Sequence, residues 1–251
     1  MIRLPSASYA AVRALMRGSE IRSHLTFVHA VLEGRHEATV FADRLDEPSR
    51  VLVCGTSGFW FPFGAADAAF LADLDAPDVD NAWIYATTRE WKSALDTLDV
   101  EPSRRIGYSS DRAAPASDTV PDGYEVRVID RYWADRFTDG IDPWVLGIWG
   151  GAERFVNKSF GVAATHDDRV VAIGAACAIG GGEAEIEAGT DPDHRKKGIG
   201  TAVCSRFITE ARRRSLEPAW SCAAGNAPSM ALAARLGFTP IEELLGYQIT
   251  Q

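Results

Sequence analysis

One stretch constrains the fold more than any other, because it joins an alternating segment to an apolar-periodic one through a short basic loop. Residues 183–190 alternate between polar and apolar side chains, and residues 199–213 repeat apolar residues at helical spacing. The loop at residues 194–201 reads His-Arg-Lys-Lys-Gly-Ile-Gly-Thr. Its glycines let the backbone turn sharply, and its N–H groups, its cations and the following helix N-terminus can surround an anion. The pattern predicts a strand, a pyrophosphate-binding loop and a helix.

Composition limits the class of protein. The 251 residues allow one large domain or two of ordinary size, and 46% hydrophobic with 24% charged residues is typical of a soluble globular chain. A net charge of −9 argues against a nucleic-acid partner, since such binding depends on neutralising phosphates. No apolar run has the length of a membrane span, and the first sixteen residues lack the apolar core of a signal peptide. We therefore expect a cytoplasmic protein without a membrane partner.

The four cysteines do not indicate a metal site. Cys54, Cys177, Cys204 and Cys222 are not paired at the spacing of metal ligands, and most lie in apolar or small-residue runs. We expect buried, reduced thiols and no bound metal.

A polar, proline-containing segment suggests two domains. Residues 109–122 contain two prolines and almost no large apolar residue, which is typical of a linker. We place the boundary near Asp118, between an N-terminal α/β domain of unknown role (residues 1–118) and a second domain (residues 119–251). The first domain has no glycine loop with basic residues, and its aromatic-rich segment at residues 55–64 is expected to be a loop whose aromatics fill the core.

Three motifs in order within the second half resemble the GNAT superfamily, the acetyl-CoA-dependent N-acetyltransferases. The first is the strand, loop and helix from Glu185 to Thr201, with its Asp-Pro-x-x-Arg lead-in. The second is Asn226-Ala-Pro-Ser229, and the third is Leu236-Gly-Phe238. The resemblance covers roughly residues 122–251.

This resemblance implies both a fold and an activity. The fold would be of the α/β (α+β) class, with a mixed, mostly antiparallel sheet flanked by helices. The smaller α/β domain before it would be a degenerate GNAT-like half, as in other two-part members. Acetyl-CoA would be the cosubstrate, and the acceptor would be a primary amine of a small molecule or a peptide. The sequence leaves a homodimer open.

The resemblance also assigns residues to the cosubstrate. Backbone N–H groups near the end of the strand would hold the pantetheine and the thioester oxygen, and the loop would hold the pyrophosphate. The residues assigned in this way are Ala188, Gly189, Thr190, Arg195, Lys196, Lys197, Gly198, Ile199, Gly200, Thr201, Asn226 and Ser229.

Acetyl transfer to an amine needs a base, and two carboxylates are candidates. Glu185 and Glu187 lie on one face of the expected strand, roughly 7 Å apart, so mutual repulsion would raise one pKa toward the useful range. Glu185 is favoured because its position matches the family's acidic position; a solvated sheet face is the alternative for both.

The acid that protonates the leaving thiolate is less evident. The position of the family's tyrosine is Ala233 here, which leaves Ser229 or water as the proton donor. The same substitution keeps open a non-catalytic acyl-CoA-binding or regulatory protein. A nucleotide phosphate binder is disfavoured, since the chain has no Gly-x-x-x-x-Gly-Lys-Ser/Thr motif.

Overall fold

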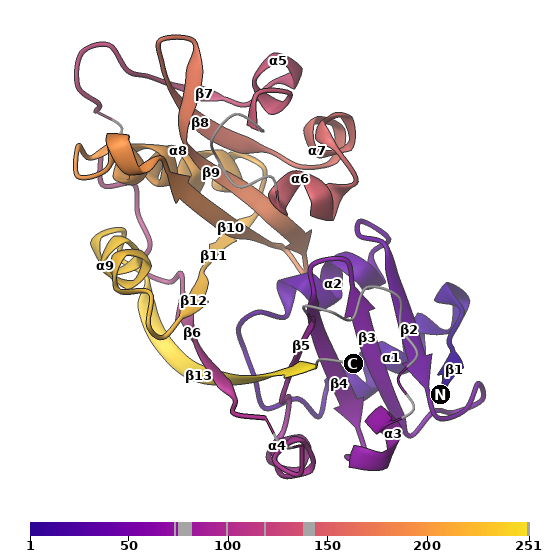
Figure 1. Ribbon diagram of the computed structural model, residues 1–251. Helices are drawn as coiled ribbons and strands as arrows, with labels where there is room; N and C mark the ends of the chain where they lie inside the picture. The colour runs from indigo at the N-terminus through magenta and orange to yellow at the C-terminus, as the bar shows by residue number, and fades with distance from the viewer. Residues whose placement is uncertain (73, 75–81, 99, 118, 138–143, 250–251) are drawn as a thin grey trace.

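The chain folds into two β-sheets with helices packed on their faces (Figure 1). The computed structural model describes residues 1–72, 74, 82–98, 100–117, 119–137 and 144–249. Most strand pairs within these residues are antiparallel, and two are parallel. This arrangement confirms the predicted fold class.

The larger sheet has eight strands and contains both the first and the last strands of the chain. These strands are β1 (Ile2–Arg3), β2 (Ala38–Ala42), β3 (Arg50–Gly55), β4 (Phe59–Gly64), β5 (Ala82–Tyr85), β6 (Ser103–Ser109), β12 (Ser221–Ala223) and β13 (Thr239–Ile249). Their order across the sheet is β1-β2-β3-β4-β5-β13-β6-β12.

The smaller sheet has five strands, all from the second half, in the order β11-β10-β9-β8-β7. They are β7 (Glu125–Val128), β8 (Gly161–His166), β9 (Arg169–Gly180), β10 (Glu183–Thr190) and β11 (Glu217–Ala219). A two-residue hairpin turn joins β8 to β9. Its two central residues, Asp167 and Asp168, have φ of 48° and 58°, as the favoured two-residue hairpin turn requires.

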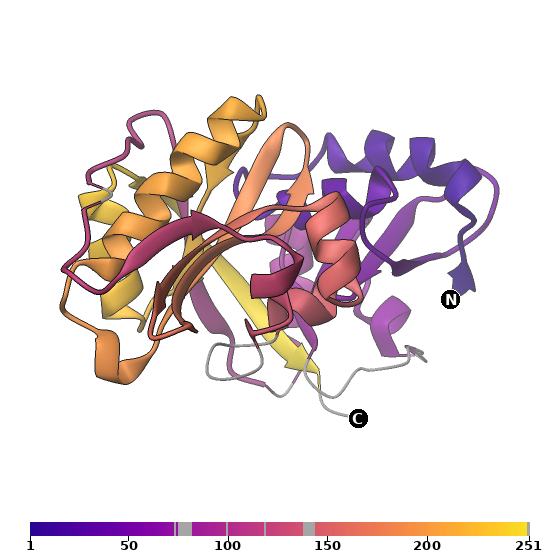
Figure 2. The same cartoon turned by 90° about the horizontal axis from the view of Figure 1, so that it is seen from above.

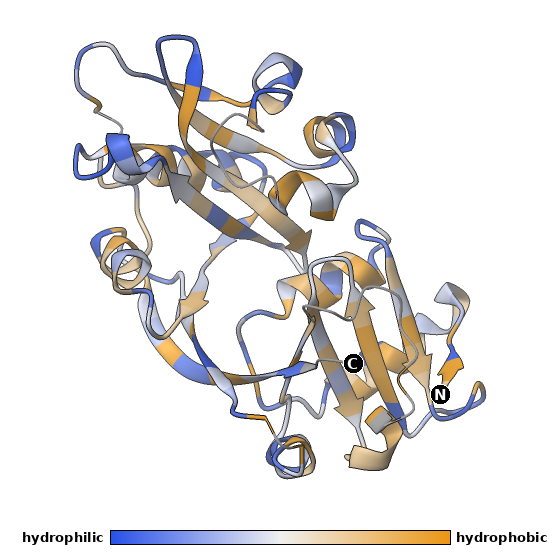
Figure 3. Cartoon of the chain, viewed as in Figure 1, coloured by the Kyte–Doolittle hydropathy of each residue, from blue (hydrophilic) through white to orange (hydrophobic). Residues whose placement is uncertain are grey.

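Nine α-helices lie among the described residues: α1 (Tyr9–Met16), α2 (Thr26–Leu32), α3 (Ala68–Ala72), α4 (Arg89–Leu95), α5 (Arg131–Ala134), α6 (Trp144–Trp149), α7 (Ala152–Lys158), α8 (Ile199–Arg213) and α9 (Ala227–Arg235). The longest, α8, runs along the five-stranded sheet (Figure 2). Figure 3 shows hydrophobic residues gathered on the strands and on the inward sides of helices.

Two helix starts follow the capping rules. Thr88 accepts a hydrogen bond from Trp91 N at the start of α4, and Asn226 accepts one from Ser229 N at the start of α9. Threonine and asparagine are both among the residues preferred at this position. At the other end of α9, Gly237 has φ of 82°, the left-handed conformation that glycine readily adopts.

The two halves share strands as well as a core. β13 pairs with β5 at Gly246↔Tyr85 and with β6 at Leu244↔Arg105, so the last strand lies between two strands of the first half. Asp118 itself lies outside the described residues, and the division at that point stays a prediction. The hydrogen-bonded sheet, however, continues across it.

Helix α2 of the first half also packs directly on the smaller sheet. A Cβ atom added at Gly180, the last residue of β9, would lie 2.4 Å from Ala30 N in α2. Only glycine allows so close an approach of the two backbones.

Two segments of the first half differ from expectation. Residues 59–64 form β4 rather than a loop, although the aromatics do fill the core: Trp60, Phe61 and Phe63 are buried. The glycines that suggested a loop stand at its ends, where Gly58 and Gly64 have positive φ. Strand β6 lies between β13 and β12 in the sheet. Its residues show no clear alternation of buried and exposed side chains, so the sequence did not mark it as a strand.

We predict that residues 119–251 do not fold alone, because β13 and β12 would lose β5 and β6. Expressed separately, this fragment should be aggregated or lack the cooperative unfolding transition of the full chain. Co-expression with residues 1–118 should restore a soluble complex. A fragment that unfolds cooperatively by itself would show that the shared sheet is dispensable.

Candidate active site

The site lies where two neighbouring strands separate. β10 and β11 pair in parallel only from Glu183↔Glu217 to Glu185↔Ala219. After Trp220 the chain enters β12, which pairs with β6 in the other sheet. The remaining residues of β10 therefore diverge from β12, and a cavity of about 700 Å³ opens between them. This volume is within the usual range for ligand sites.

The cavity is lined by β10, the basic loop, the start of α8, β12 and α9. All but one of the residues predicted to bind the cosubstrate line it, the exception being Lys197. Those that do are Ala188, Gly189, Thr190, Arg195, Lys196, Gly198, Ile199, Gly200, Thr201, Asn226 and Ser229.

The loop presents a helix N-terminus to the cavity. Gly198 caps α8 with φ of 82°, and Lys196 also has a positive φ of 60°. No atom lies within 4 Å of a Cβ added at Gly198, so the space beside it is open. The unpaired N–H groups of the first turn and the positive end of a 15-residue helix favour an anion at this place.

The three cations of the loop have different surroundings. Arg195 donates from Nε to Thr190 O at 2.9 Å, which fastens the loop to the end of β10. Lys197 donates to the hydroxyl of Tyr124 at 3.0 Å, and that hydroxyl lies 2.9 Å from His194 Nδ1. Arg195 and Lys196 line the cavity, whereas Lys197 ties the loop to the segment before β7.

Ser229 sits at the start of α9 with its hydroxyl beside the cavity. Trp220 Nε1 donates to Ser229 Oγ at 3.2 Å. That bond uses a lone pair and leaves the hydroxyl hydrogen free to be donated. Ala233, one turn further along α9, is fully buried.

The two candidate carboxylates differ in exposure. Glu187 is partly exposed and lines the cavity. Glu185 is only 2% exposed, and its Oε1 accepts a hydrogen bond of 2.6 Å from Ser221 Oγ. Burial raises the pKa of Glu185 to about 7, with a further increase from Glu183. Desolvation is therefore the main cause of the raised pKa of Glu185. The sequence suggested repulsion from Glu187 as the cause, and that expectation is wrong.

Two side chains of the first half complete the surroundings of Glu185. Arg105 in β6 donates from Nε to Ser221 Oγ at 3.0 Å, and His24 Nδ1 lies 3.0 Å from the same oxygen. Sequence reasoning missed Arg105, His24 and Ser221 as site residues. No local pattern marks them: Arg105 and Ser221 meet through the pairing of β6 with β12, and His24 contacts Ser221 from the segment before α2.

Within the described residues, the first half contains a similar strand arrangement, with side chains between the strand ends. β4 and β5 pair in parallel through α3, as β10 and β11 do through α8. Beyond that pair, Trp91 Nε1 donates to Gly64 O at 3.0 Å, and the Thr87 hydroxyl donates to Pro62 O. These two side chains occupy the place between the diverging strand ends.

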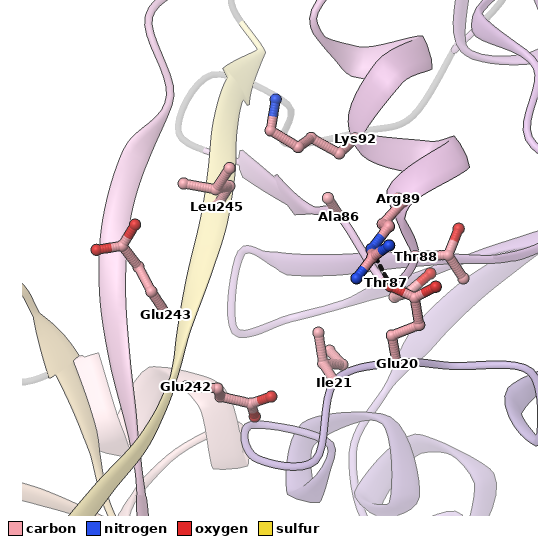
Figure 4. Close-up of a pocket in the computed structure, with 10 residues that line it drawn as sticks. All are labelled: Glu20, Ile21, Ala86, Thr87, Thr88, Arg89, Lys92, Glu242, Glu243 and Leu245. Carbon is pink, nitrogen blue, oxygen red and sulfur yellow. Dashed lines mark ion pairs between the residues drawn. The ribbon is translucent and has the colours of Figure 1, made fainter.

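A second, smaller hollow of about 210 Å³ lies beside the start of α4 (Figure 4). Its walls carry charges of both signs, including Lys92 on one side and Glu243 on the other, and Arg89 pairs with Glu20 at 3.9 Å. It has no glycine loop, so it does not resemble the anion-binding end of the larger cavity.

Neither a metal centre nor a membrane helix is found in the described part of the chain. No three His, Cys, Asp or Glu side chains there are grouped to hold a metal ion. Of the helices described, none is long and apolar enough to span a bilayer. All four cysteines are buried free thiols, as expected.

A family model and a sequence relative both indicate the same protein family. The family model described as GNAT acetyltransferase matches residues 19–247. The chain is 26% identical over 233 residues to the uncharacterized N-acetyltransferase YdfB of Bacillus subtilis (strain 168), covering 88% of this chain and 89% of that protein.

Solved structures share the fold. A GCN5-related N-acetyltransferase-like protein from Streptococcus suis 89/1591 superposes with a TM-score of 0.77 at 19% identity, covering 97% of this chain and 98% of the other. A tandem GNAT protein from the clavulanic acid biosynthesis pathway gives 0.64 at 12% identity, with 98% and 96% covered. With the family match spanning nearly the whole chain, this protein belongs to the GNAT acetyltransferase family and is an N-acetyltransferase.

Proposed function

We propose that the protein transfers the acetyl group of acetyl-CoA to a primary amine in the cavity between β10 and β12. The observation that carries this proposal is the continuity of that cavity. One end has the helix N-terminus and two cations, and the other has the exposed edge of β10 with Glu187 and Ser221. A pyrophosphate at the first end and a thioester at the second match the order of these groups in acetyl-CoA, where the pantetheine arm separates them.

The loop would bind the pyrophosphate. Arg195 and Lys196 supply full charges, and the backbone N–H groups at the start of α8 supply oriented donors. The backbone edge of β10 beyond Glu185 has no β11 partner, and amide groups on this edge can pair with the pantetheine amides and polarise the thioester carbonyl.

Glu185 is the proposed general base. An ammonium group must lose a proton before it attacks a thioester, and a base with a pKa of about 7 is well suited to accept it near neutral pH. Glu187, on the cavity wall, would attract the cationic acceptor. Ser229 is the proposed donor to the departing thiolate, since its hydroxyl hydrogen is free and Ala233 is buried without a polar group.

Binding can be tested at Gly198. We predict that Gly198→Glu abolishes the rise in melting temperature that acetyl-CoA produces, because it places a like charge at the pyrophosphate position. Gly198→Asn is the matched control, since asparagine tolerates a positive φ and the space there is open. ATP should stabilise the native protein much less than acetyl-CoA. Equal stabilisation of both variants by acetyl-CoA would refute the loop assignment.

Catalysis can be tested by thiol release from acetyl-CoA with a panel of primary amines. We predict that Glu185→Gln lowers kcat/KM about 10²- to 10⁴-fold, the usual contribution of a general base. In the native protein kcat/KM should fall below about pH 7, where the carboxyl becomes protonated. Unchanged kcat/KM in Glu185→Gln would remove this residue from the mechanism.

The buried carboxylate also predicts a pH dependence of stability. The ordinary pKa of 4.5 is raised to about 7 in the folded state, so between these values only the folded chain keeps the proton. Stability therefore falls as pH rises through that window, by about 3 kcal/mol in total.

Glu185→Gln should remove this fall. We compare the free energy of unfolding in urea of the variant with that of the native protein. The difference, variant minus native, should be larger at pH 8 than at pH 4.5. The exposed control Glu101→Gln should follow the native protein. An equal difference at both pH values would contradict the raised pKa.

A further inference from the structure

The polar cluster around Glu185 draws its donors from the first half of the chain. Ser221 Oγ stands at its centre, with Glu185 Oε1 at 2.6 Å, Arg105 Nε at 3.0 Å and His24 Nδ1 at 3.0 Å. Ser221 and Arg105 also line the cavity, whereas Glu185 and His24 lie behind them, 2% and 1% exposed. The cluster therefore forms the floor of the proposed acetyl-transfer site.

Donor and acceptor counting fixes the direction of each bond. A hydroxyl has one hydrogen and two lone pairs, and a guanidinium can only donate. When Glu185 is ionised it can only accept, so the Ser221 hydrogen is directed at Oε1 and Arg105 occupies one lone pair. The second lone pair is left for an N–H of His24, which requires the proton on Nδ1.

The surroundings of His24 agree with this tautomer. The rings of Phe27, Phe59 and Tyr85 lie 4.8 to 5.0 Å from the imidazole. Burial, with Arg105 nearby, lowers the pKa of His24 well below its usual value, so the ring is neutral. Its Nε2 is buried with no hydrogen-bond partner among the described residues. A bare nitrogen there costs less than an unpaired N–H would.

The two carboxylate oxygens of Glu185 therefore differ in their hydrogen bonding. Oε1 is fixed by Ser221, while Oε2 is buried and has no hydrogen-bond partner within the described part of the chain. We infer that His24 and Arg105 of the first half act through Ser221 as positioning residues, holding Glu185 so that Oε2 is the atom that accepts the acceptor's proton. This inference rests on the proposed function.

The step balances without a further reactant. An N–H bond of the acceptor ammonium breaks and an O–H bond forms at Oε2, the proton passing through a water because Glu185 is 2% exposed and does not line the cavity. The freed lone pair forms the C–N bond at the thioester carbon, and the C–S bond breaks. The second amine proton passes through Ser229 to the thiolate, giving the amide and free CoA.

Several of the groups that face Glu185 set its pKa. Hydrogen bonding from Ser221 and the charge of Arg105 lower it, against burial and the charge of Glu183, which raise it. From β9, Cys177 is directed at the backbone oxygen of Glu185 at 3.3 Å. Removing Ser221 or Arg105 therefore moves the pKa of the carboxyl further upward.

The test compares pH profiles of kcat/KM, with acetyl-CoA and an amine that the native protein acetylates. Ser221→Ala should move the acid limb upward by about one pH unit, since a hydrogen bond to a charged group is lost. Ser221→Thr should restore it. Ser205→Ala is the matched control: Ser205 is also buried and accepts from Ala116 N, but lies in α8 away from the cluster.

The first-half residues need their own variants. Arg105→Met should move the limb upward, and His24→Phe should do so less, because it keeps the aromatic packing but lacks the donor. His24→Asn should restore the limb, since its amide can donate at the place of Nδ1. In the unsubstituted protein, ¹⁵N chemical shifts should show a neutral His24 protonated at Nδ1, a readout independent of turnover.

The two proposals fail differently. If the unsubstituted protein releases no thiol with any amine, the proposed function fails and the role of Oε2 fails with it. If it turns over but the acid limb stays in place in Ser221→Ala and Arg105→Met, only the positioning role is refuted. Protonation of His24 at Nε2 would also refute it. A purely structural role would lower kcat/KM at every pH and leave the limb unmoved.

Discussion

The insertion of β6 between β13 and β12 is the interaction on which the rest of the structure depends. β12 pairs with β6 at Cys222↔Ile106 and cannot at the same time continue beside β10. The strand that would close the smaller sheet is thus drawn into the larger one, and the edge of β10 is left uncovered after Glu185. The cavity lies where the strands part, and the register of β10 against β9 also shifts there, between Glu185 and Ile186. Without the first half of the chain, β12 would have no competing partner.

The same interaction explains why a carboxylate can be buried at the floor of the cavity. An ionised side chain out of water is expensive unless it is hydrogen-bonded and close to opposite charge. Glu185 receives its hydrogen bond from Ser221 on β12, and Ser221 in turn is held by Arg105 on β6. The bonds span both sheets, so they form only when the strands are assembled. The hydrogen bond from Ser221 and the charge of Arg105 offset only part of the effect of burial, so the pKa of Glu185 stays raised.

Local signals in the sequence predicted the parts of the site that local structure determines. Helix α8, the basic loop before it and the Asn226 cap follow from periodicity, glycine position and capping chemistry, and each stands where it was expected. The strand β6 and the partners of Glu185 could not be predicted in this way. Arg105 and His24 are far from Ser221 in sequence; the pairing of β6 with β12 brings Arg105 to it, and the packing of the segment before α2 brings His24. The alternation that placed Glu185 and Glu187 on one face could not show which is buried.

A comparison of the two halves indicates what an acetyl-transfer site needs beyond diverging parallel strands. Both halves have a strand, a helix and a parallel strand, and in both the pair separates after a short parallel ladder. In the first half Trp91 and Thr87 fill the space and satisfy the carbonyls of β4. In the second, β10 faces small residues and a glycine loop, and its free edge remains available to a ligand. The two halves therefore differ in what lies between the separating strands: side chains in the first half and an open cavity in the second.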